Sequence, residues 1–152
     1  MTSPRSDAAF WGRWTPAQRF ALVLGAVYLV VAIAGFAITG LHPFSGMEHH
    51  TLVIFAVNPL HNILHLVLAV VWLAAAPRPA AARLANIALG VVLGLVTVLG
   101  FVGGMGMLGM SGLADPDNFL HLASATLALY FGSVGAVSAR SEADDEPEKI
   151  DA

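Results

Sequence analysis

The sequence contains no cysteine. This absence excludes disulfides, iron–sulfur clusters and thiol nucleophiles, whichever compartment the chain faces. Charge is also scarce, because Asp, Glu, Lys and Arg make up only 11% of the 152 residues, against about 25% in ordinary soluble domains. Hydrophobic residues make up 57%, against about 45–50%. This balance is typical of a single-domain protein that is solvated by lipid.

Motifs for catalysis are missing as well. The chain has no HExxH motif and no GxSxG elbow, so the sequence names no catalytic residue and favours a protein that is not an enzyme. The apolar runs carry no charged residue at mid-bilayer depth, where proton relays and ion sites usually require one. The net charge of −3 comes mainly from the acidic C-terminal tail, and we expect no nucleic-acid partner.

Four apolar runs dominate what is present. They cover about 20–39, 60–76, 84–108 and 119–138, and each is close to the ~20 residues that cross ~30 Å of hydrocarbon. Thr15-Pro16-Ala17-Gln18 reads as a capping box at the start of the first run. The predicted fold class is all-α, a four-helix transmembrane bundle. Its parts are a juxtamembrane segment at 1–19, the helical domain at 20–139 and a disordered acidic tail at 140–152.

The basic residues predict the orientation of this bundle. All seven precede the first run, separate the second from the third, or follow the fourth: Arg5, Arg13, Arg19, Arg78, Arg83, Arg140 and Lys149. Under the positive-inside rule, both termini and the middle loop are cytoplasmic. The two loops without basic residues then face outward.

A short motif recurs in the two halves of the chain. Asn62-Ile63-Leu64-His65-Leu66 and Asn118-Phe119-Leu120-His121-Leu122 match at four of five positions and lie 56 residues apart. Each follows a proline, Pro59 or Pro116, that suits the first turn of a helix. We expect two repeated helical hairpins related by an axis along the membrane normal, with His65 and His121 at equal depth.

The third run is rich in glycine. Gly90 and Gly94 form one GxxxG pair, and Gly100 and Gly104 form another. Such pairs let helix backbones approach closely in lipid. They indicate either packing within the chain or a seam with a second copy or another membrane protein.

The chain resembles a family of small bacterial membrane proteins, domain-of-unknown-function family 4383. The resemblance covers about residues 14–140 and rests on three segments: Thr15-Pro16-Ala17-Gln18, Asn58-Pro59-Leu60-His61-Asn62 with Leu64-His65, and Asp117-Asn118 with Leu120-His121. It implies a multi-pass protein of the bacterial cytoplasmic membrane. The family has no assigned reaction, so the resemblance implies no catalytic role.

The candidate site is a polar cluster near the predicted outer face. Its members are His61, Asn62, His65, Asn118 and His121. In one interpretation these side chains hydrogen-bond across helices, and the protein is a structural or accessory membrane component. In the alternative, His61, His65 and His121 bind copper or zinc. Secondary candidate ligands are Met105, Met107, Met110 and Asp117.

Haem is a further variant of the binding hypothesis. His65 and His121 at matched depth could supply two axial ligands. The predicted outer side has no Lys or Arg to pair with haem propionates, so haem ranks below a dissociable metal ion. The sequence leaves the structural and the metal-binding hypotheses open.

Overall fold

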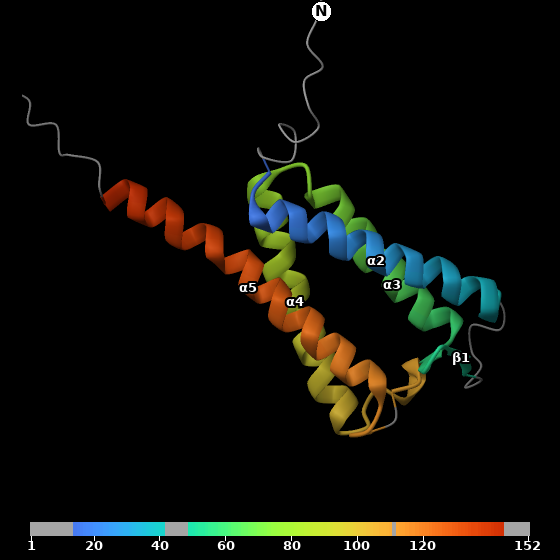
Figure 1. The fold of residues 1–152 in the computed structure, drawn as a ribbon. Coiled ribbons are helices and arrows are strands. Elements are labelled where there is room, and N and C mark those ends of the chain that lie inside the picture. The colour runs from blue at the N-terminus through green and yellow to red at the C-terminus, as the bar shows by residue number, and fades with distance from the viewer. Residues whose placement is uncertain (1–13, 42–48, 111, 145–152) are drawn as a thin grey trace, which may run out of the picture.

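The described residues form four long helices arranged as two antiparallel hairpins. The computed structural model describes 14–41, 49–110 and 112–144, with side chains as far as 134. The helices are α2 (Pro16–Thr39), α3 (Pro59–Ala75), α4 (Pro79–Phe101) and α5 (Pro116–Asp144). Helix α2 packs along α3, and α4 packs along α5 (Figure 1). The chain is therefore mostly helical, as the sequence predicts.

Each of these four helices begins at a proline, in the position where its missing N–H costs nothing. Thr15 caps α2 in the predicted capping box, because Gln18 N donates to Thr15 Oγ1 at 3.3 Å and Thr15 N donates to Gln18 Oε1 at 3.1 Å. Asn58 Oδ1 caps α3 by accepting from His61 N at 2.9 Å. The predicted capping box at Thr15 and the predicted place of Pro59 in the first turn of a helix are confirmed.

Two of the described helices, α2 and α4, are long and apolar enough to cross a membrane. Helix α3 is apolar but shorter, at 17 residues. Helix α5 continues to Asp144, beyond the predicted domain boundary at 139, while residues 145–152 of the predicted tail lie outside the described part of the chain.

The predicted end of the third run at residue 108 is wrong, because α4 ends at Phe101. A glycine-rich turn follows, in which Gly103 and Gly109 have φ of 76° and 89°. L side chains rarely adopt this left-handed region, so glycine is required for the chain to fold back here. The segment then forms a short 3-10 helix, η1 (Gly106–Leu108), and an isolated bridge between Met105 and Met110.

One element was not expected from the sequence. The predicted outer loop at 40–57 contains a β-hairpin of β1 (His50–Leu52) and β2 (Phe55–Val57), paired in antiparallel register from His50 with Val57 to Leu52 with Phe55. The hairpin contacts α2 and α5. It is too small to change the fold class, but it contributes a wall and a backbone acceptor near the candidate site.

A buried polar bridge links the hairpins at the end of the bundle that carries the α3–α4 connection. Trp72 Nε1 donates to Asn86 Oδ1 at 3.0 Å, and Asn86 Nδ2 donates to Ala17 O at 3.1 Å. Small residues such as Ala17 and Ala69 are buried around it, which lets the helices approach closely. Helices α2, α3 and α4 are thus joined at this end, and the candidate site lies toward the other.

Candidate functional site

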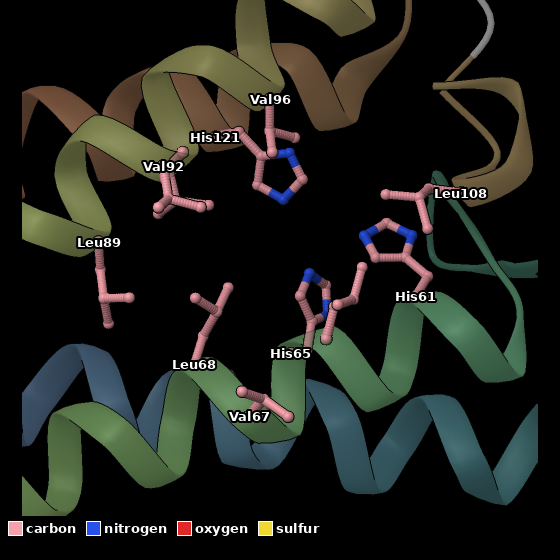
Figure 2. A pocket seen from close by; sticks show the side chains of 11 residues that line it. His61, His65, Val67, Leu68, Leu89, Val92, Val96, Leu108 and His121 are labelled. Carbon is pink, nitrogen blue, oxygen red and sulfur yellow. The ribbon is translucent and has the colours of Figure 1, made fainter. Parts of the chain in front are cut away.

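Three histidines from two hairpins meet inside the bundle. His61 and His65 lie one turn apart on α3, and His121 comes from α5 (Figure 2). The ring centroids of His61 and His65 are 4.3 Å apart, and each lies 5.9 Å from that of His121. The three side chains are only 1%, 3% and 3% exposed. We call them the histidine cluster.

The ring nitrogens of the cluster are close together and poorly satisfied. One ligand nitrogen from each ring lies within 4.8 Å of the others. His61 Nδ1 lies 3.3 Å from Ala56 O. In contrast, His61 Nε2, both ring nitrogens of His65 and His121 Nδ1 are buried without a hydrogen-bond partner among the described residues.

This lack of partners is unusual for buried imidazoles. A neutral imidazole always carries one N–H donor and one acceptor nitrogen. Leaving a buried polar group unpaired costs about 1–3 kcal/mol. Hydrogen bonds to the described residues therefore do not hold His65 in place. Its one unprotonated nitrogen suits a ligand that accepts a lone pair.

A tyrosine ring and a mainly apolar cavity border the cluster. The edge of the Tyr28 ring meets His65 with centroids 5.1 Å apart. The three histidines also line one end of a cavity of about 310 Å³, whose other walls are Leu64, Val67, Leu68, Leu89, Val92, Leu93, Val96 and Leu108. No charged side chain among the described residues lines this cavity.

The structure does not bring the two asparagines into the histidine cluster. Asn62 Nδ2 donates to Thr39 Oγ1 at 3.0 Å, on the other helix of its own hairpin. Asn118 Nδ2 donates to Gly112 O at 2.7 Å, in the turn before α5. The five residues proposed from sequence therefore separate into three histidines that meet and two asparagines that each stabilise one hairpin.

Of the secondary candidates, the methionines lie outside the histidine cavity, whereas Asp117 lies near His65. Met107 is 70% exposed, and the buried Met110 packs its methyl group toward Gly100. Of the described methionines, none lines the histidine cavity. Asp117 is buried and shares a second cavity, of about 250 Å³ between α2, the β-hairpin and α5, with His65. Its Oδ2 has no hydrogen-bond partner within the described part of the chain.

Sequence reasoning missed two contributors to the site. Tyr28 is a lone tyrosine in an apolar run, and only the packing of α2 on α3 places its ring against His65. The Ala56 carbonyl belongs to a strand that was not predicted. No side-chain pattern could reveal a backbone acceptor.

The fold and the histidine cluster together define a class: a small helical protein with helices apolar enough to cross a membrane and three buried histidines that share one site. Residues 18–134 match the family described as Domain of unknown function (DUF4383), and the chain belongs to this family. The resemblance inferred from sequence is thus confirmed. The chain matches no curated protein and no solved structure.

Proposed function

We propose that this protein is a four-span membrane protein that binds one transition-metal ion, zinc or copper, through His61, His65 and His121. The observation that carries the proposal is the meeting of three buried imidazoles whose nitrogens lie within 4.8 Å of one another and largely lack hydrogen-bond partners in the described chain. Neutral imidazole is a preferred ligand of both metals.

The distances are compatible with one shared ion. In a tetrahedral site, two nitrogens that each lie ~2.0–2.1 Å from zinc are about 3.4 Å apart. The separations of up to 4.8 Å in the cluster therefore require the widest pair to close by about 1.4 Å, which rotation of the imidazole side chains would have to provide. Three protein ligands would leave one coordination position open, as in catalytic rather than structural zinc sites.

His61 has the environment expected of a metal ligand. Its Nδ1 lies 3.3 Å from Ala56 O, so donation of the Nδ1–H to this carbonyl would leave the Nε2 lone pair available. Metal-bound histidines almost always donate their other ring N–H in this way, which fixes the tautomer and the ring orientation. The β-hairpin would thus serve the site through its backbone.

The structural alternative is less well supported. It requires hydrogen bonds from the histidines and asparagines across helices. Asn62 donates to Thr39 of α2, but His65 has no hydrogen bond to any described residue. Haem gains no specific support either, because the described walls of the cavity offer no cationic partner for propionates. A bound metal ion would account for one unpaired nitrogen on each ring, which the structural alternative leaves unexplained.

Metal binding by purified protein tests this proposal. After removal of metal with a chelator, the wild type should take up about one zinc or copper ion per chain by elemental analysis. Loss of a side chain that only hydrogen-bonds to a metal ligand lowers metal affinity roughly 10–100-fold. The His65→Ala variant loses a ligand itself, so its metal affinity should fall by more than this. The matched control is His50→Ala, because His50 is an exposed histidine on β1.

Thermal unfolding separates a lost ligand from a damaged fold. A bound ion stabilises the folded state by mass action, so zinc should raise the melting temperature of the wild type and of His50→Ala but not of His65→Ala. If His65→Ala melts at a lower temperature yet binds metal like the wild type, the histidines have a structural role and the proposal is wrong.

A further inference from the structure

The histidine cavity is polar at one end and apolar at the other. His61, His65 and His121 gather at one end, while Leu68 and Leu89 line the opposite end (Figure 2). Helix α3 runs away from the cluster toward Leu68, and α4 approaches it from Leu89. The long axis of the cavity therefore follows the helices.

The side of this cavity opens between α3 and α4. Three of its lining residues are also exposed on the outer surface of the bundle: Leu64 at 39%, Val67 at 52% and Val92 at 46%. All three are apolar, and they lie on helices that the proposed topology places in the bilayer. A ligand could thus pass sideways from the hydrocarbon layer into the cavity without crossing a polar surface.

We infer that this cavity binds a single-chain fatty acid, with its carboxylate at the histidine cluster and its hydrocarbon tail between α3 and α4. The inference rests on the proposed function, because the bound ion would offer its open position to the carboxylate. Carboxylate oxygen is an ordinary zinc ligand. The described walls hold no lysine or arginine that would favour a phosphate headgroup instead.

The polar and apolar ends of the cavity also favour a fatty acid over the tail of a neighbouring membrane phospholipid. A phospholipid tail that enters sideways would bring a methyl group to the histidines and leave their nitrogens unpaired. A fatty acid brings its head to the nitrogens and its tail to the apolar walls. A volume of about 310 Å³ is at the lower end of the roughly 300–1,000 Å³ of ligand pockets, and it suits one chain rather than two.

Cobalt-substituted protein in lipid nanodiscs tests the inference, because a new ligand changes the visible absorption of Co²⁺. Decanoate should change the spectrum at concentrations at least about tenfold lower than acetate, since only decanoate adds buried methylene groups. Decanol, which has the tail without the carboxylate, should leave it unchanged. Equal potency of acetate and decanoate would overturn the inference.

Matched tryptophan variants locate the tail. Val92→Trp should block the cavity and abolish the response to decanoate, whereas Leu95→Trp should retain it, because Leu95 is 59% exposed on the same helix but does not line the cavity. Leu64→Trp narrows the cavity from α3 and should act like Val92→Trp. If both cavity variants bind cobalt and respond to decanoate like the wild type, the inference is wrong.

Photocrosslinking tests fatty-acid binding in the cavity independently of metal binding. A diazirine-bearing decanoic acid, added to metal-free and to zinc-loaded protein, should label Leu68 and Val92 themselves, with stronger labelling when zinc is bound. If the chain binds no metal but these two residues are still labelled above the level at Leu95, the proposed function fails and the fatty-acid cavity stands. Uniform labelling of all lipid-facing positions would overturn the cavity inference alone.

Discussion

At the scale of single residues, two asparagine–glycine contacts hold the hairpins together. The Asn62 side chain packs directly on Gly35 of α2, and the Asn118 side chain packs directly on Gly100 of α4. A Cβ atom added at either glycine would overlap the asparagine amide oxygen. Each hairpin thus has the same pair of residue types at its closest approach. These paired contacts support the predicted duplication, which stays a prediction.

Replacement of Gly100 by alanine should therefore destabilise the protein. The added methyl group must displace the Asn118 amide, and such overpacking costs typically about 1–3 kcal/mol. Gly94→Ala on the same helix is the control, because nothing lies within 4 Å of its ideal Cβ position, and the better helix propensity of alanine favours this variant by up to ~1 kcal/mol. Unfolding in detergent, followed by circular dichroism, should rank Gly94→Ala at or above the wild type and Gly100→Ala below both. Equal stability of the two variants would contradict the tight contact at Gly100.

The sequence alone identified Asn62 and Asn118 as candidate residues but did not predict which residues they contact. The recurring motif singled out Asn62 and Asn118, and helical spacing put each within one turn of a histidine. It could not show that each amide turns toward its own hairpin, because that depends on a glycine more than ten residues away in the other helix. Of the two predicted GxxxG pairs, only Gly90 and Gly100 are covered by α5. Nothing lies within 4 Å of an ideal Cβ at Gly94, and one at Gly104 would meet only Leu99. The alternative seam with another chain stays a prediction.

At the scale of elements, one asparagine joins three helices. Asn86 on α4 accepts from Trp72 on α3 and donates to the Ala17 carbonyl on α2. These residues are fully or almost fully buried, and hydrogen bonds between helices have few competing partners in hydrocarbon. Trp72 lies two turns along α3 from His65, and the Tyr28 ring contacts both of them. The hydrogen bonds of the bridge nevertheless involve no histidine, so we expect the bridge to stabilise the bundle without holding the metal.

A double-mutant cycle with Asn86→Leu and Trp72→Phe measures this bridge. Each variant alone should lower stability, and the double variant should lose less than the sum. The coupling free energy should be near the ~0.6 kcal/mol average, with a maximum of ~1.7 kcal/mol, measured for hydrogen bonds between membrane helices. Zinc or copper uptake should stay at the wild-type level in all three variants. Additive losses, or a loss of metal binding equal to that of His65→Ala, would show that the bridge has been assigned the wrong role.

Helix starts were easier to predict than helix ends. Proline after Thr15 or Asn58 is a local signal, because it sets the backbone and the cap within a few residues. The end of α4 has no comparable local signal. Hydropathy alone extended the predicted run to residue 108, whereas the helix ends at Phe101, at the start of the glycine-rich segment. The β-hairpin at 50–57 was missed for a similar reason. Its strands of three residues each are too short to show an alternating pattern.

At the scale of the whole molecule, the ends of the bundle differ in charge. The described basic residues Arg19, Arg78 and Arg83 lie near the starts of α2 and α4, where these helices meet the end of α3 (Figure 1). The opposite end carries the β-hairpin, η1 and the start of α5, with the histidine cluster just inside it. If lipid surrounds the bundle, the positive-inside rule places the basic end in the cytoplasm and the cluster near the outer face. The backbone of Arg140 lies in α5, and Arg5, Arg13 and Lys149 lie outside the described residues.

Cysteine labelling in intact cells tests this orientation, and the absence of native cysteine makes the chain a clean background. Leu113→Cys places a thiol at the end near the cluster, where Leu113 is 73% exposed, and Ala80→Cys places one on the exposed first turn of α4 beside Arg78. With four spans and both termini inside, a membrane-impermeant maleimide should label position 113 in intact cells and position 80 only after permeabilisation. The reverse pattern would place the basic end outside, against the bias that sets the orientation of such short loops. Labelling of both positions in intact cells would mean that α4, the helix between them, does not cross the bilayer. The orientation also decides access to the histidine cluster, because only the expected one lets an impermeant chelator outside the cell compete for the bound ion across the short outer turns.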